Sequence, residues 1–138
     1  MLFRSMHRNT FLNSPGFLNS SFEMISRKQC FFAGQITGVE GYVESAGSGL
    51  VAGITLAYEL NGKVPPVFPF CTALGAMGRH VSSPNTDFQP MNCSFGLIDS
   101  LPVIPGAKRI RNKQDRYSAV AEKALACIRE IKMSDGRK

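Results

Sequence analysis

Two segments of the chain carry the hydrophobic pattern of an α-helix. Residues 40–60 form an apolar, glycine-rich stretch that begins near Glu40 or Gly41 and ends at Asn61-Gly62. Residues 113–132 place apolar side chains at helical spacing, with charged residues on the opposite face. The pattern predicts a helix over each segment. The apolar stripe of the second helix comprises Tyr117, Val120, Ala121, Ala124, Leu125, Ile128 and Ile131.

A short apolar run precedes the first predicted helix. Residues 30–33 read as a buried strand that ends at Gly34, and residues 35–39 as a glycine-containing loop. Residues 63–107 hold most of the prolines and show little periodicity. In that region we expect short strands or turns around residues 67–68 and 95–98, and a short helix around residues 72–80.

The strand, the glycine loop and the helix start form the most informative stretch. The first N–H groups of a helix lack internal partners and carry partial positive charge. Glycine at such a place lets a ligand approach the backbone closely. The stretch is therefore suited to an anionic or carbonyl-bearing ligand, such as a phosphate or the edge of a flavin ring.

The glycines within this helix need a compensating interaction. Each of Gly41, Gly47, Gly49 and Gly53 costs about 1 kcal/mol relative to alanine in a helix interior. Close packing, or contact with a cofactor at the first turn, would offset that cost. Gly47-x-Gly49-x-x-Ala52 also matches the dinucleotide fingerprint, but it lies in mid-helix rather than directly after a strand. We therefore interpret these glycines as packing surface.

Composition allows a buried core, and the charge is unevenly distributed. Of the 138 residues, 43% are hydrophobic and 19% charged, which suits one domain or a piece of a larger one. The net charge of +6 lies wholly in residues 108–138, which hold ten basic and four acidic side chains. This asymmetry indicates an anionic partner, nucleic acid first, although a solvated helix with a basic tail is the alternative.

The sequence argues against a zinc site, a disulfide framework and a membrane span. Its four cysteines are widely spaced and form no CxxC pair, which favours reduced thiols and predicts no metal site. The start of the chain has no signal-peptide pattern. The longest uncharged apolar stretch, residues 45–58, is shorter than the ~20 residues that cross a bilayer. A cytoplasmic protein is expected.

Four segments, in order, resemble one enzyme family. AGQITGVEGYVESAGSGLVAG (33–53) is similar to the C-terminal flavin motif of the bacterial folate- and FAD-dependent tRNA (uracil-54-C5)-methyltransferases. MHRNTFLNSP (6–15), FQPMNCSFGL (88–97) and KRIRNKQDRYSAVAEKAL (108–125) also resemble that family. The related flavoprotein that modifies the tRNA wobble uridine shares the AGQ-G-GY-E core but not HRNTF or FQPMN. It therefore ranks second.

The resemblance implies a fold and an activity. The fold is α/β: the C-terminal part of a Rossmann-like FAD-binding domain in residues 1–62, then residues 63–138 as an irregular segment with the basic helix 113–132. Family members bind FAD and take a methylene group from methylenetetrahydrofolate. They use NAD(P)H to reduce the flavin, and the methyl group ends on C5 of a uridine in the T loop of tRNA. The flavin carries both the hydride and the one-carbon unit.

The resemblance also implies site residues. Those near the flavin are Gly34, Gln35, Gly38, Glu40, Gly41 and Tyr42, and those near the folate or substrate are His7, Arg8 and Asn9. Gln89 and Asn92 are further pocket candidates. The alternatives are loop and N-cap roles for Gln35 and Glu40, and surface exposure for His7 and Arg8. No catalytic residue carries over, because the family's cysteines match none of those here.

Full-length members of the family begin with a strand and a GxGxxG turn that binds the FAD pyrophosphate, and this sequence has no counterpart. We therefore expect a fragment that lacks the N-terminal FAD-binding segment and is incomplete for catalysis. Alone it should be poorly stable, aggregation-prone or dimeric, without tightly held FAD. The competing interpretations are a stand-alone RNA-binding module that uses helix 113–132, and a non-functional remnant.

Overall fold

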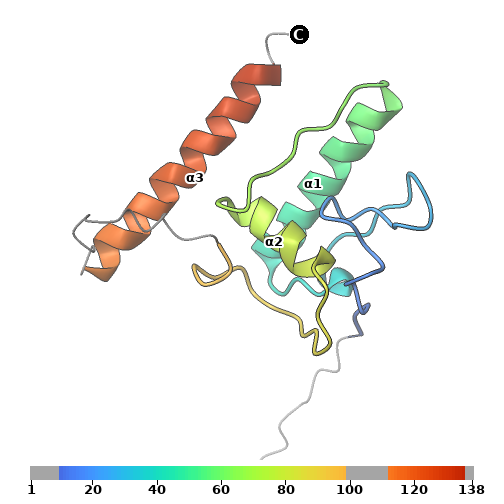
Figure 1. Cartoon of the computed structure of the whole chain (residues 1–138), viewed down its shortest axis with the longest axis horizontal. Helices are drawn as coiled ribbons and strands as arrows, with labels where there is room; N and C mark the ends of the chain where they lie inside the picture. The colour runs from blue at the N-terminus through green and yellow to red at the C-terminus, as the bar shows by residue number, and fades with distance from the viewer. Residues whose placement is uncertain (1–9, 99–111, 136–138) are drawn as a thin grey trace, which may run out of the picture.

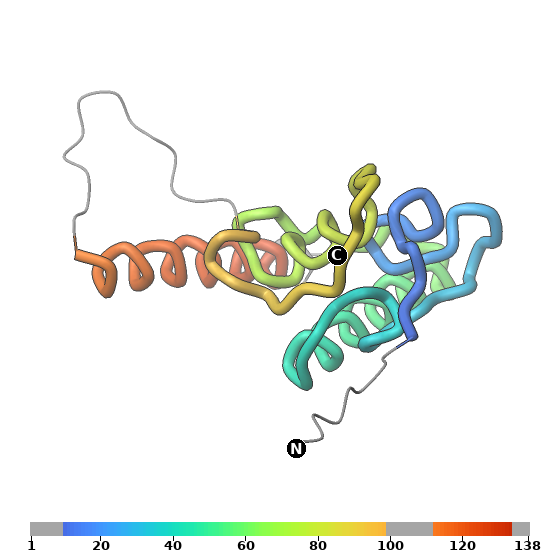
Figure 2. The backbone as a smooth tube through the Cα atoms, turned by 90° about the horizontal axis from the view of Figure 1, so that it is seen from below, coloured from blue at the N-terminus to red at the C-terminus, as the bar shows by residue number. Residues whose placement is uncertain are grey.

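The computed structural model describes residues 10–98 and 112–135. These residues form a short 3-10 helix, η1 (Gln35–Thr37), and three α-helices: α1 (Tyr42–Leu60), α2 (Ala73–Ser82) and α3 (Lys113–Asp135). In both views α2 lies between α1 and α3, and the N-terminal segment folds along α1 (Figures 1 and 2). Within the described ranges, β pairing is confined to isolated bridges.

The strand predicted at residues 30–33 is not formed as a regular strand. Phe31 makes an isolated antiparallel bridge with Glu23, and the N–H of Phe32 donates to the carbonyl of Phe22 at 2.9 Å. The segment is therefore an extended stretch of chain that lies against residues 22–24. Among the described residues, no strand of regular length pairs with it. Residues 67–68 are likewise irregular, and residues 95–98 form a turn. Of the predicted α/β fold, the described residues therefore form the helices but no sheet.

The helices predicted from the sequence are present in the structure. α1 begins and ends within two residues of its predicted bounds, and α2 covers the short helix expected at residues 72–80. Thr72 caps α2 because its side-chain oxygen accepts from the N–H of Gly75 at 3.1 Å. On α3 the predicted apolar stripe is only partly correct. Val120 is buried, but Leu125 is 54% exposed and Ala121 faces solvent.

The core forms where α1 meets α2. Its buried members are Phe22, Val39, Val51, Ala52, Met77 and Val81, so the segments before and after residue 62 share one cluster. Close approach of the two helices depends on Gly47, where a Cβ atom would lie 2.8 Å from Met77 Cε and 3.2 Å from Leu74 Cδ2. The packing role predicted for Gly47 and Gly49 therefore holds at Gly47, whereas a Cβ at Gly49 would meet only Ala33 Cβ, at 3.9 Å. At Gly53 an added Cβ would point into open space among the described residues.

None of the helices in the described part of the chain has the combined length and hydropathy to cross a membrane.

A buried carboxylate organises the N-terminal segment. Glu23 is only 2% exposed, and its Oε1 accepts from the N–H of Gln29 at 3.0 Å. Its Oε2 accepts from Asn19 Nδ2 at 3.0 Å and from Lys28 Nζ at 3.3 Å. Burial alone would raise the pKa of this carboxyl, but the hydrogen bond from Gln29, together with Lys28 and Asn19, outweighs it and lowers the pKa. The charged form therefore stabilises the fold.

Glu23→Gln should lower the free energy of unfolding at pH 7 by about 1–3 kcal/mol, because charged hydrogen bonds are lost. Since the folded pKa lies below the unfolded value of 4.5, the wild-type contribution is present above that pH and is lost as pH falls through the folded pKa. Urea denaturation at several acidic pH values measures this. The variant should lose less stability on acidification than the wild type. Glu122→Gln, on the exposed surface of α3, is the control and should match the wild type.

Candidate functional site

Three of the four motif segments meet at the loop that leads into α1. From the N-terminal segment, the N–H of Leu12 donates to the carbonyl of Ile36 at 2.8 Å, and Ser14 Oγ donates to the carbonyl of Thr37 at 2.8 Å. On the other side, Met91 N–H donates to the Gly38 carbonyl and Met91 O accepts from the Glu40 N–H, each at 3.1 Å. Residues 34–41 are therefore held between two distant parts of the sequence.

Gly38 is the tightest point of this loop. Its φ of 86° lies in the left-handed region, and a Cβ atom built there would collide with the ring of Phe88. Phe88 is 6% exposed and stacks against His80 with ring centroids 4.9 Å apart. Burial of His80 lowers its pKa, and the hydrogen bond to the Gln89 carbonyl only partly opposes this shift. The neutral imidazole therefore belongs to the packing behind the loop.

The start of α1 has no side-chain cap. The N-cap residue is Gly41, with φ 110° and ψ 158°, and it provides no side-chain acceptor for the first-turn N–H groups. Tyr42 is 94% exposed and Val43 is 81% exposed, so this turn faces solvent. A helix start with this geometry presents donors and partial positive charge to a ligand.

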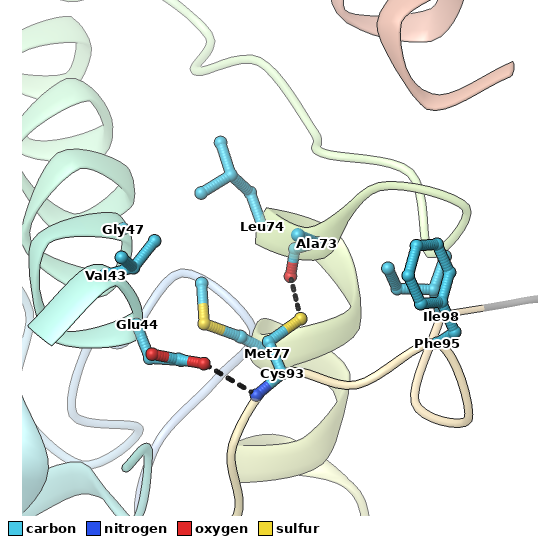
Figure 3. Close-up of a pocket in the computed structure, with 9 residues that line it drawn as sticks. All are labelled: Val43, Glu44, Gly47, Ala73, Leu74, Met77, Cys93, Phe95 and Ile98. Carbon is cyan, nitrogen blue, oxygen red and sulfur yellow. Dashed lines mark hydrogen bonds between the residues drawn. The ribbon is translucent and has the colours of Figure 1, made fainter. Parts of the chain in front are cut away.

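Two polar side chains fix the turn from behind. Asn92 Nδ2 donates to the Glu40 carbonyl at 2.7 Å, and Glu44 Oε1 accepts from the N–H of Cys93 at 3.0 Å. Figure 3 shows the Glu44 carboxylate reaching from α1 toward Cys93. The 91–93 segment thus sets the position of the first turn of α1.

A cavity of about 280 Å³ lies between this turn, α2 and the 93–98 segment (Figure 3). Its walls are mostly apolar, and the Glu44 carboxylate and Cys93 thiol add polar groups. The lining residues are Val43, Glu44, Gly47, Ala73, Leu74, Met77, Cys93, Phe95 and Ile98. Burial, and then the negative charge of Glu44, raises the pKa of the Cys93 thiol. A thiol in this environment stays protonated near neutral pH and is a poor nucleophile.

The predicted flavin-side residues all lie on the loop and the helix start. Gln35 begins η1, and the side chains of Gln35 and Glu40 are exposed. Of the two further pocket candidates, Asn92 contacts the loop, whereas the Gln89 side chain donates to Asp87 Oδ1 at 3.3 Å instead. The predicted substrate-side residues, His7, Arg8 and Asn9, lie outside the described residues.

Sequence reasoning missed several residues that build the site. Ser48 Oγ accepts from the N–H of Gly34 at 2.8 Å and so ties the loop to the second turn of α1. Glu44 was detectable, because it occupies the third helical position, where acidic side chains commonly bond to groups at a helix start. Ser14, Ser48 and Phe88 carry no comparable signal, because the loop residues that they contact are far away in sequence. Among residues 10–98 and 112–135, no cluster of three or more His, Cys, Asp or Glu side chains could hold a metal ion.

Gly38→Ala and Gly62→Ala form a matched pair that measures the Phe88 contact. Both glycines have positive φ, but no atom lies within 4 Å of a Cβ placed at Gly62. Gly62→Ala should lower the unfolding free energy by about 1–2 kcal/mol through backbone strain alone. Gly38→Ala should cost about 1–3 kcal/mol more, because the methyl group also displaces Phe88. Equal losses in urea denaturation would contradict the assigned contact.

Two comparisons with known proteins identify relatives of the chain. The family model described as glucose inhibited division protein A matches residues 3–64. Over 129 residues, the chain is 52% identical to methylenetetrahydrofolate–tRNA-(uracil-5-)-methyltransferase TrmFO of Staphylococcus aureus strain JH9. The proteins of the same name from strains Newman and N315 are equally similar. The match covers 92% of this chain but only 28% of the length of each relative. With 52% identity across nearly its whole length, the chain belongs to the family of these tRNA (uracil-5-)-methyltransferases.

Proposed function

We propose that the chain forms the flavin-adjoining portion of an enzyme that methylates C5 of a uridine in the T loop of tRNA. Methylenetetrahydrofolate supplies the carbon, and FAD and NAD(P)H are the other participants. The observation that carries this proposal is the uncapped, exposed start of α1, held by three segments that belong to the 52%-identical match.

The residues present fit the edge of a flavin. The first-turn N–H groups of α1 can donate to a carbonyl oxygen. The missing side chains of Gly38 and Gly41 make room for Phe88 and for Glu44 with Asn92, which hold that turn in place. Gln35 and Glu40 stand exposed beside this backbone and would contact the rest of the cofactor. Bound FAD would supply the hydride and one-carbon chemistry that no side chain provides. The chain's own contribution is to bind and orient it.

A second polypeptide segment would complete the site. One face of α1 carries exposed apolar side chains: Tyr42, Val43, Leu50 and Leu60. The two carboxylates of the helix, Glu44 and Glu59, lie outside this face, so the face is uncharged. An apolar helix face of this kind is normally covered. We propose that an N-terminal FAD-binding segment covers it, with residues 1–62 as the end of that domain and residues 63–138 as an extension.

The substrate would be tRNA, yet α3 itself contributes little charge. It contains five basic and four acidic residues, so most of the excess positive charge belongs to residues outside the described helix. A stand-alone basic module that binds RNA through this helix is therefore the weaker alternative. The wobble-uridine flavoprotein shares only the AGQ-G-GY-E core and stays second.

A chimera tests the function directly. The corresponding C-terminal segment of a Staphylococcus aureus relative is replaced by this chain, and the purified protein is assayed for flavin absorbance. Methyl transfer from labelled methylenetetrahydrofolate to tRNA is measured in parallel. The chimera should retain FAD and modify the T loop. Gly41→Val should abolish flavin retention because a side chain at this positive φ would displace Glu44 and Asn92 and distort the helix start, whereas Gly53→Ala, in open space, should not. Modification at the wobble position instead would favour the second candidate. A folded, colourless chimera would refute the proposal.

The exposed face of α1 predicts how the isolated chain behaves. Alone it should self-associate and retain no tightly bound FAD, because that apolar face has no cover. Leu50→Gln should shift the size-exclusion profile toward monomer. Leu125→Gln on α3 is the matched control, since the two leucines are 53% and 54% exposed. A yellow, monomeric wild-type chain, or equal effects of the two substitutions, would contradict this prediction.

A further inference from the structure

Two cysteines far apart in sequence lie side by side at the junction of α2 and α3. The Sγ atoms of Cys71 and Cys127 are 3.2 Å apart, and both residues are half-buried free thiols. A disulfide bond requires the sulfur atoms to come to about 2 Å, so the two atoms would have to move closer by about 1 Å. The other two cysteines have no such neighbour in the described residues. The Cys93 thiol instead points toward the carbonyl of Ala73 at 3.8 Å.

The positions of both thiols are fixed by the surrounding structure. Cys71 precedes Thr72, whose hydroxyl donates to the Pro69 carbonyl at 2.7 Å and whose N–H donates to the same carbonyl at 2.9 Å. Cys127 lies on the face of α3 that also carries the buried Val120. One further contact, the parallel stack of Phe95 and Tyr117 with centroids 4.0 Å apart, holds the same face of α3. The packing of the surrounding residues therefore holds the two sulfur atoms next to each other.

We propose that Cys71 and Cys127 form a reversible redox pair whose disulfide locks α3 onto the start of α2. The oxidant is a low-molecular-weight disulfide such as oxidised glutathione. One thiolate attacks a sulfur of that disulfide and releases one glutathione thiolate. The second cysteine loses its proton, attacks the protein sulfur of the mixed disulfide and releases the second glutathione. Two protein thiols are thereby oxidised to one disulfide while glutathione disulfide is reduced to two glutathione molecules.

The electrostatic setting determines how fast this exchange runs. The hydrogen bond with Cys71, and then partial burial and the charge of Glu130, raises the pKa of Cys127, while Lys123 opposes the shift. The Cys127 thiol is therefore protonated at neutral pH in the reduced protein. Since the thiolate is the attacking species, oxidation should accelerate as pH rises. In a reducing compartment the pair stays open and closes only under oxidising conditions.

Non-reducing peptide mapping of the full chain tests the pair. Each of the four cysteines falls on a different tryptic peptide, with Cys71 in residues 64–79 and Cys127 in residues 124–129. After incubation of the folded protein with oxidised glutathione, two of the four free thiols should disappear and the mass should fall by two hydrogen atoms. Peptides 64–79 and 124–129 should be recovered joined, and dithiothreitol should separate them. The yield at a fixed time should rise with pH.

Variants make the outcome unambiguous. Cys71→Ser and Cys127→Ser should each abolish the linked peptide. In each variant the remaining cysteine of the pair should accumulate as a glutathione adduct. Cys30→Ser, which removes a cysteine distant from the pair, should oxidise like the wild type. A wild-type chain that keeps four thiols, carries stable glutathione on both cysteines, or links other cysteines as readily would overturn the proposal. These readouts do not depend on flavin or tRNA, so they stand or fall separately from the proposed enzymatic function.

Discussion

The main-chain pairing of the 34–41 loop with two distant segments is the constraint on which the rest of the structure depends. Leu12 and Ser14 hold the carbonyls of η1 from one side, and Met91 bonds to Gly38 and Glu40 from the other. The described residues form no regular sheet, so these few hydrogen bonds hold the segments together, as the hydrogen bonds between strands do in an α/β domain. They fix where α1 begins, and the helix start is the chemically distinctive feature of the chain.

The direction of α1 is set by a second, apolar constraint. Gly47 lets Met77 and Leu74 of α2 approach the helix backbone, and the core around Val51 and Val81 fills the space beside that contact. α2 is held in the same way, because Gly78 lies directly against the carbonyl of Ser20. Small residues thus serve packing on the inner side of both helices. On its outer side α1 instead carries the exposed large side chains Tyr42, Val43, Leu50 and Leu60.

The helices could be predicted from the sequence because their signals are local: apolar spacing, the Asn61-Gly62 stop and the Thr72 cap. The loop residues of the candidate site, with Asn92 as a further pocket candidate, were predicted from a family resemblance rather than from a local signal. The strand at residues 30–33 could not be judged locally, because a strand exists only if a neighbour pairs with it. The same is true of the contact of Phe88 with Gly38 and of the hydrogen bond of Ser48 with Gly34, because each joins residues that are far apart in the sequence. Leu125 belongs to the predicted apolar stripe of α3 and yet is 54% exposed, because periodicity gives the spacing of apolar residues but not the width of the face that becomes buried.

The bond between Glu44 and Cys93 has a mechanical consequence for the whole molecule. It ties the first turn of α1 to the 91–98 segment, and two residues further along that segment Phe95 stacks on Tyr117 of α3. An unbroken path of contacts therefore runs from the exposed helix start to the C-terminal helix, skirting the cavity. The position of the Glu44 carboxylate and that of the aromatic pair on α3 are therefore set by the same three residues, Cys93 to Phe95.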